Sequence, residues 1–262
     1  MQNFRYSSFV SNLTNEQLSS YPIGYIARVE ADLSQINLVI QNTTIRAVML
    51  NIDDVEMLVN KGLDSSYFGP NKLVITTSTI DDRSLSRYYL EKEVEIITDF
   101  GPKFHVPRDR PVYLSQNKKE RMWNIRTQVE ETIEMRELLH GTSTKLIPLL
   151  KGVDREELLS SYISLKNERF KAFSYYVAQY FGNGRGNLST DLINDVRVIS
   201  TLPSINYVIL IGVQSENIIR KLPPLVRAYS GLGFIRENYW KNRKINDIGQ
   251  SSLSQFSSSG GQ

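Results

Sequence analysis

The sequence predicts a single α/β domain that folds as a closed (β/α)8 barrel of the TIM type. The chain has 262 residues, of which 40% are hydrophobic and 23% charged, a composition that fits one well-filled globular domain. Short β-branched runs alternate with amphipathic stretches, an order typical of parallel strands joined by helices outside the sheet. Seven or eight strands within about 210 residues favour a closed barrel over an open doubly wound sheet.

The expected strands are short, largely apolar runs of a length typical of buried strands. They lie at residues 45–52, 72–77, 104–107, 145–150, 173–181, 207–213 and 233–235. A further run at 94–98 fits either one more strand or the end of a helix. The gaps between these runs leave room for a helix after almost every strand.

Apolar residues at intervals of three and four predict the helices between these runs. The longest helix is expected over residues 118–140, with a stripe formed by Met122, Ile125, Val129 and Ile133. Asp154 and Glu157 have the spacing of a capping box and predict a helix start. Two more helices are expected to begin at Ser189 or its neighbour and at Ser215.

Changes in composition divide the chain into three expected segments. Residues 1–32 form an N-terminal segment of uncertain structure, and residues 33–249 carry the alternating pattern of the barrel. Residues 250–262 form a flexible tail rich in Ser and Gly, whose composition cannot sustain a packed core. We therefore expect one folded domain followed by a tail.

Composition also excludes several classes of function. The 31 basic and 28 acidic residues leave a formal charge of +3, too small for a protein that binds nucleic acid through its overall charge. With no Cys and two His, the chain is expected to hold neither a disulfide nor a metal, and no cofactor is expected. No apolar run reaches the 18 or so residues of a membrane span, and no signal peptide is evident, so we expect a cytoplasmic protein without a membrane partner.

In a barrel of this type, functional residues lie where strands end and loops toward helices begin. Asp109 follows the strand expected at 104–107 and stands between Arg108 and Arg110. The two arginines would keep its carboxylate ionised, and the carboxylate could accept hydrogen bonds from a base edge or a sugar. The alternative is an ion pair that orders the loop.

Glycine turns follow two later strands. Gly152 would let a substrate approach the backbone, and Lys151 could bind an anion near the start of the next helix. Gly212 ends another strand in the same way. The loop 182–186 (GNGRG) could hold a phosphate through backbone N–H groups, but it lacks the lysine of a P-loop. Ordinary strand-to-helix turns are the alternative at each of these places.

A basic segment with aromatic residues lies near the C-terminus. Residues 236–244 contain four cations and one anion, together with a Tyr and a Trp. Basic side chains can neutralise phosphates while an aromatic ring stacks on an unpaired base. The residues expected to bind nucleic acid are Arg236, Trp240, Lys241, Arg243 and Lys244. A solvated helix end with inward-packed aromatics is the alternative.

Three stretches of the chain together resemble a known family. They are 106–113 (VPRDRPVY) before a long helix, 145–158 (KLIPLLKGVDREEL), and 207–215 (YVILIGVQS) before a helix and 231–235 (GLGFI). Over about residues 72 to 243 the chain is similar to the tRNA-guanine transglycosylases, especially the shorter branch that places 7-deazaguanines in DNA. The resemblance implies a (β/α)8 barrel and a pentosyltransferase that exchanges guanine for a 7-deazaguanine base by means of an Asp nucleophile.

The resemblance assigns substrate contacts to several positions. Asp109 matches the carboxylate that reads the incoming base. Gly152 matches the glycine of a V-Q-G loop, in which Leu150 or Lys151 stands in place of the Gln. Gly212 lies in the segment that leads to the nucleophile.

At three features the chain departs from the family pattern. Thr77 stands where the family has an acid/base Asp, and a shifted alignment would supply Asp99 instead but leave too little chain before Asp109. Arg236 stands at the nucleophile, with Glu237 next to it, and the family's Cys/His zinc site is absent. Because an arginine stays protonated, Glu237 is the expected nucleophile if the exchange reaction is retained.

Three functions remain open on these observations. The first is a transglycosylase-like enzyme that exchanges guanine for a 7-deazaguanine base in DNA or tRNA, with Glu237 and Asp109 as catalytic residues. Its substrate contacts would be Thr77, Lys151, Gly152 and Gly212. The second is a catalytically degenerate barrel that binds nucleic acid or partners an active transglycosylase subunit, so that homo- or hetero-oligomers are possible. The third is an unrelated barrel enzyme that acts on a small phosphorylated molecule through Lys151 and the loop 182–186.

Overall fold

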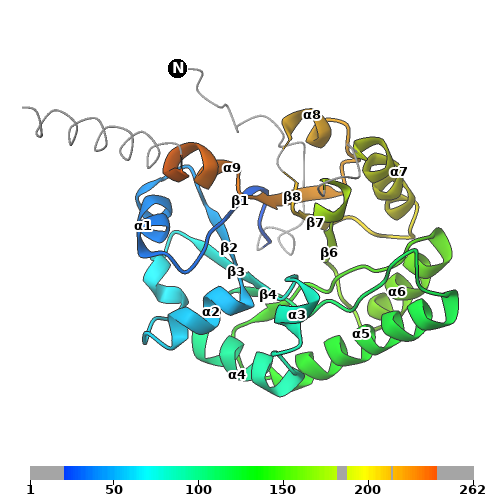
Figure 1. Ribbon diagram of the computed structural model, residues 1–262, viewed down its shortest axis with the longest axis horizontal. Helices are drawn as coiled ribbons and strands as arrows, with labels where there is room; N and C mark the ends of the chain where they lie inside the picture. The colour runs from blue at the N-terminus through cyan, green and yellow to red at the C-terminus, as the bar shows by residue number, and fades with distance from the viewer. Residues whose placement is uncertain (1–20, 182–187, 214, 241–262) are drawn as a thin grey trace, which may run out of the picture.

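The computed structural model describes residues 21–181, 188–213 and 215–240, and in these ranges one parallel sheet is covered by helices on its outer side (Figure 1). The strands are β1 (Gly24–Arg28), β2 (Ala47–Asn51), β3 (Leu73–Thr77), β4 (Phe104–Val106), β5 (Lys145–Leu146), β6 (Phe173–Tyr176), β7 (Val208–Ile211) and β8 (Val226–Gly231). The helices are α1 (Leu33–Gln41), α2 (Ile52–Val59), α3 (Asp82–Leu85), α4 (Leu90–Phe100), α5 (Lys118–Leu138), α6 (Arg155–Asn167), α7 (Ser189–Ser200), α8 (Glu216–Ile219) and α9 (Gly233–Ile235). The predicted alternation of strand and helix is confirmed.

The eight strands form one curled sheet in the order β5-β4-β3-β2-β1-β8-β7-β6, and every pair in it is parallel. The first and last strands lie side by side in its middle, with Ile26 opposite Ser230. The edge strands β5 and β6 are joined by a single parallel bridge between Leu149 and Ser174. There Leu150 donates its N–H to the Ser174 carbonyl at 2.9 Å, and Ser174 donates to the carbonyl of Pro148 at 2.8 Å. The α/β class and the all-parallel order are confirmed, whereas the described strands do not form a continuous ladder around a closed barrel.

Alternate residues of each strand pack on opposite sides of the sheet, as the pleat of a strand requires. In β2, Ala47 and Met49 belong to the core inside the curl, while Val48 and Leu50 pack against the helices. Strand β7 repeats this division. The space inside the curl therefore contains a core of apolar side chains contributed by alternate strand residues.

The helices begin and end largely where local chemistry predicts. Helix α6 starts after Asp154, whose Oδ1 accepts a hydrogen bond from the Glu157 N–H at 2.9 Å, so the predicted cap is confirmed. Helix α5 starts at Lys118 as expected, capped by Asn117. Within the described ranges, no helix has both the length and the apolar character needed to span a membrane.

The sequence interpretation was wrong at one strand and incomplete at another. Residues 233–235 form α9 rather than a strand, because the chain turns helical after Gly231 and Arg236 donates its N–H to the carbonyl of Leu232 at 2.8 Å. The last strand is β8, whose mixed sequence VRAYSG lacks a continuous apolar run. Strand β1 lies within the segment 1–32, for which no structure was assigned. The open run 94–98 belongs to α4.

A fully buried polar network ties α4 to the sheet. His105 of β4 lies between Thr76 of β3, 2.8 Å from its Nδ1, and Glu93 of α4, 2.9 Å from its Nε2. Glu93 also accepts a hydrogen bond from the Ser78 hydroxyl. Because buried polar groups are costly unless they are hydrogen-bonded, this network holds α4 against β3 and β4.

We expect Gly152→Ala to destabilise the fold by about 3 kcal/mol, because the new methyl group would overlap backbone. A Cβ at Gly152 would lie 2.5 Å from the Leu158 nitrogen in the first turn of α6. Gly62 is the matched control, since its φ is +73° but nothing lies within 4 Å of a Cβ there. Urea denaturation should give a loss of about 1 kcal/mol for Gly62→Ala. Equal losses for the two variants would show that close packing on α6 is not the constraint.

Candidate functional site

Polar side chains from the ends of three strands and from the loops after two others lie at the carboxyl ends of the sheet. Arg28 and Asn51 are the last residues of β1 and β2, and Tyr176 is the last residue of β6. Asp109 and Lys151 lie in the loops that follow β4 and β5. This is the end of a parallel α/β sheet where ligands bind in proteins of this architecture.

Asp109 and Lys151 form a largely buried ion pair. The Lys151 Nζ lies 2.6 Å from the Asp109 Oδ1, and the two side chains are 14% and 17% exposed. Burial raises the pKa of Asp109, and the neighbouring Lys151 opposes that rise. The sequence interpretation had placed Arg108 and Arg110 as the cations beside Asp109. Instead Arg110 donates from Nε to one oxygen of Glu131 of α5 at 2.8 Å and from Nη2 to the other. The Asp109 carboxylate pairs with Lys151 of the loop after β5.

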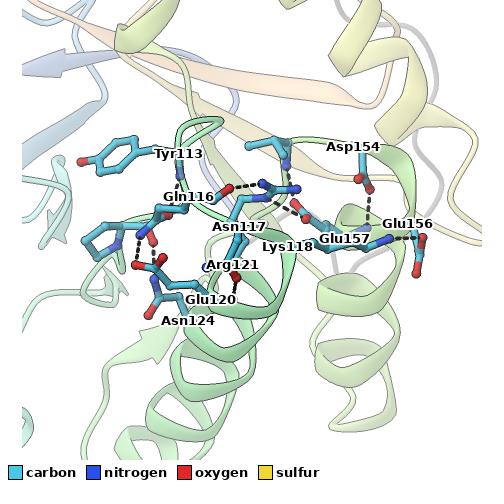
Figure 2. A network of polar contacts seen from close by, with 12 residues as sticks. Tyr113, Gln116, Asn117, Lys118, Glu120, Arg121, Asn124, Asp154, Glu156 and Glu157 are labelled. Carbon is cyan, nitrogen blue, oxygen red and sulfur yellow. Dashed lines mark hydrogen bonds and ion pairs between the residues drawn. The ribbon is translucent and has the colours of Figure 1, made fainter.

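The two loops are held together by a network at the starts of α5 and α6 (Figure 2). Arg121 of α5 donates from Nε to Glu157 of α6 at 2.9 Å, and it also donates to the Gln116 carbonyl. Glu157 is fully buried, and its second oxygen accepts the Val153 N–H at 2.9 Å. The network therefore fixes the loop after β4 relative to the loop after β5, and with them the positions of Asp109 and Lys151.

A smaller set of contacts orders the loop after β4. Asn124 of α5 donates to the Pro111 carbonyl at 2.7 Å, and Gln116 accepts the Tyr113 N–H at 2.8 Å. The Tyr113 hydroxyl reaches Asp82 of α3 at 2.9 Å. Burial and Asp82 together raise the pKa of Tyr113 to about 12, so the hydroxyl stays protonated as a donor. These contacts join α3 to the rim of the polar cluster.

Arg28 ends β1, and β2 and β3 lie between β1 and β4, the strand that precedes Asp109. Its guanidinium donates to the side-chain oxygen of Asn51, and among the described residues no carboxylate forms an ion pair with it. Burial lowers the pKa of Arg28, an effect that Tyr176, Asp54 and Asp53 oppose. Burial raises the pKa of Tyr176, and Arg28 lowers it while Asp109 raises it. Arg28 and Asp109 thus have opposite effects on the pKa of the same group, the Tyr176 hydroxyl at the end of β6.

The other predicted substrate contacts are occupied by the protein itself. Thr77 is fully buried, with its Oγ1 2.9 Å from that of Thr79. The space beside Gly152 is filled by α6, and a Cβ on Gly212 would lie 2.9 Å from that of Ala178. These glycines are required by packing, and any contact of theirs with a substrate stays a prediction.

The predicted nucleophile lies on an exposed turn. Arg236 and Glu237 are exposed, in a helical turn over Arg236–Trp240. That turn is attached to the outer side of β1 and to α1, because Tyr239 donates to Asp32 at 2.9 Å and the Phe234 N–H donates to Tyr25 at 3.1 Å. Outside the described residues lie the side chain of Trp240, the residues Lys241, Arg243 and Lys244, and the loop 182–186.

Sequence reasoning missed Arg28, Asn51 and Tyr176. Arg28 lies in the segment 1–32, for which the sequence predicts no definite structure, and the signal that could have found it is the run GYIAR followed by the helix cap Asp32. Asn51 and Tyr176 lie inside runs that were recognised, but a strand's end cannot be fixed to one residue from its composition. Asp99, the alternative carboxylate, is exposed in the last turn of α4.

The candidate site is not assigned by a metal-ligand group among the described residues or by similarity to known proteins. Within the described ranges no group of three or more His, Asp or Glu residues is placed to hold a metal ion. No protein-family model and no curated protein sequence matches the chain.

Asp54 connects the β1 end of the cluster to α2. It lies in the first turn of α2, is 7% exposed, and accepts the Ala31 N–H at 2.7 Å. Burial raises the pKa of Asp54 from 3.8 to about 6. Its carboxyl group binds a proton more tightly in the folded chain, so the free energy of unfolding falls as the pH rises from about 4 to about 6.

We expect Asp54→Asn to remove this part of the pH dependence. A change of about two pKa units corresponds to about 3 kcal/mol, so the variant should be more stable than the parent by up to that amount at pH 7. The Asn oxygen can still accept the Ala31 N–H. Urea denaturation at pH 4, 5, 6 and 7 measures the effect, with the exposed Asp99→Asn as control. An unchanged pH slope in Asp54→Asn would contradict the expectation.

Proposed function

We propose that the chain is a transglycosylase-like (β/α)8 barrel that binds a guanine-type base at the carboxyl ends of its strands. The observation that carries the proposal is the largely buried pair of Asp109 and Lys151. The resemblance of 106–113 and 145–158 to the tRNA-guanine transglycosylases independently selects the same two loops for contact with the base.

The chemistry of the pair fits one edge of guanine. Guanine and 7-deazaguanine present two neighbouring N–H donors, at N1 and N2, beside the acceptor O6. A carboxylate accepts two hydrogen bonds side by side, and an ammonium group donates to an adjacent oxygen. Asp109 would accept from N1 and N2 while Lys151 donates to O6. Adenine has no such pair of donors on that edge, so the arrangement favours guanine.

The barrel form is supported by the curl of the sheet and the contact between its edges. Backbone hydrogen bonds join 148–150 to Ser174, which brings β5 and β6 together. Pro148 has no N–H, which accounts for the short ladder at this place. In a closed barrel, inward-facing side chains from every strand fill the interior. The polar residues at the carboxyl ends of the strands then surround one open end of the barrel.

The positions of Arg236 and Glu237 favour base binding without base exchange. Exchange requires a nucleophile that reaches C1′ of the nucleoside in the pocket. An arginine side chain is not a suitable nucleophile, and Glu237 is exposed on a turn attached to the outer side of β1. We therefore propose a barrel that recognises a guanine or 7-deazaguanine base, in DNA, tRNA or a free nucleotide, without replacing it. Exchange with Glu237 as nucleophile is the second candidate, supported by the family resemblance.

We expect Asp109→Asn to weaken the binding of guanosine by about tenfold to a hundredfold, because hydrogen bonds to a charged group are lost. The amide is similar in size to the carboxylate and presents one N–H₂ donor toward the two donors of the base. Isothermal titration with guanosine and adenosine measures the effect. The parent should prefer guanosine, and Asp99→Asn should behave as the parent. Equal binding of the two nucleosides by the parent would contradict the proposal.

The exchange reaction is tested separately by release of labelled guanine from tRNA and from DNA in the presence of a 7-deazaguanine base. We expect no release above background from the parent chain. Release that disappears in Glu237→Gln but persists in the neighbouring exposed variant Asn238→Asp would overturn the binding-only proposal and establish Glu237 as the nucleophile.

A further inference from the structure

We infer that Arg28, with Asn51 and Ser230, forms a second subsite in the same polar cluster at the carboxyl ends of the strands, and that this subsite binds a phosphate group, so that the ligand is a nucleotide. The phosphate half of this inference stands on its own observations, and the nucleotide half rests on the proposed base site. The three residues come from adjacent strands, since β8 and β2 flank β1 in the sheet.

Arg28 is placed to bind an anion inside the curl of the sheet. It follows Ile26 by two residues, and Ile26 belongs to the interior core, so the Arg28 side chain starts on the inner face at the carboxyl end. A guanidinium has five N–H donors in a planar fork that fits the oxygens of a phosphate. The Asn51 amide oxygen accepts from one nitrogen and brings no negative charge.

The charge of Arg28 is only weakly balanced by its surroundings. Asp53 and Asp54 favour the charged guanidinium from a distance, but neither forms an ion pair with it in the described part of the chain. The Asp54 carboxylate is instead used by the Ala31 N–H. Burying a cation without an ion-pair partner is unfavourable, and such a group is commonly retained where a ligand supplies the missing charge.

Ser230 supplies an independent second observation. Its hydroxyl is fully buried near the end of β8 and has no hydrogen-bond partner among the described residues. It follows Ala228, which belongs to the interior core, and it lies opposite Ile26 of β1, two residues before Arg28. The hydroxyl thus starts from the inner face, on the strand that neighbours β1. A free buried hydroxyl is a ready donor to an anion.

The charges of Asp109, Lys151 and Arg28 also favour an anionic ligand. Asp109 is neutralised by Lys151 at 2.6 Å, so Arg28 leaves one positive charge in excess among these three groups. Tyr176 lies within the electrostatic reach of both Arg28 and Asp109 and connects the two subsites. A ligand with a guanine edge at one end and a phosphate at the other satisfies both. Guanosine monophosphate has this chemistry.

Titration of the full chain with inorganic phosphate, in a buffer low in chloride, tests the phosphate subsite without any base. Calorimetry should show binding by the parent and a loss of about tenfold or more in Arg28→Gln. Arg46→Gln is the matched control, because Arg46 is exposed just before β2, at the opposite end of the sheet. Phosphate should raise the melting temperature of the parent and of Arg46→Gln, but not that of Arg28→Gln. Equal binding by Arg28→Gln and the parent, or no binding by the parent up to about 20 mM, would overturn the subsite.

A comparison of guanosine with guanosine monophosphate separates this inference from the proposed function. We expect the monophosphate to bind about tenfold more tightly to the parent and equally with guanosine to Arg28→Gln. If Asp109→Asn leaves the binding of both ligands unchanged while Arg28→Gln abolishes the advantage of the monophosphate, the base site fails and the phosphate subsite stands. If the advantage persists in Arg28→Gln, the subsite is overturned whatever Asp109→Asn shows.

Discussion

The ion pair between Asp109 and Lys151 is the interaction on which the proposed pocket depends. Its two members come from loops after neighbouring strands and are 42 positions apart in the sequence, so the pair forms only when β4 and β5 are in register. The register alone would not fix two loop side chains. The buried contact of Arg121 with Glu157 and the close approach of Gly152 to α6 hold the loops in place. Packing at the helix starts thereby determines the geometry of the polar pair.

Arg28 adds a positive charge without an ion-pair partner, among the described residues, to the proposed site. The charges of a carboxylate and an ammonium at 2.6 Å largely cancel, whereas the Arg28 guanidinium at the end of β1 bonds the neutral Asn51 and has no ion-pair partner among the described residues. A partly buried charge without an ion-pair partner lowers the stability of the fold. Burial of Asp54, which acts electrostatically on Arg28, raises its pKa and also lowers the stability near neutral pH. Functional sites commonly carry such costs while the rest of the protein compensates. Here the compensation comes from the interior core and from the apolar layer between sheet and helices.

Local patterns predicted the parts of the fold that local physics decides. The spacing of Asp154 and Glu157 located the start of α6, and the apolar runs located six of the strands. Strand β8 was missed because its residues alternate in polarity, and the apolar residues 233–235 were misread because three residues do not distinguish a strand from a helical turn.

The candidate site could be predicted only in part. Asp109 and Lys151 were selected individually because each follows a predicted strand, but their pairing depends on which strands are neighbours and on how the loops pack. The adjacent Arg108 and Arg110 were the natural partners in sequence, yet Arg110 turns to Glu131 on α5. Glu237, the expected nucleophile, lies on an exposed turn for a similar reason. A sequence alignment does not show on which side of β1 a segment packs.

The most direct test of the pocket is a crystal structure of the chain with guanosine monophosphate, grown at low ionic strength. We predict the base edge against Asp109 and Lys151 and the phosphate against the Arg28 guanidinium, inside the curl of the sheet. A nucleotide bound on an outer helix face, or an empty mouth at saturating nucleotide in solution, would contradict the proposed pocket.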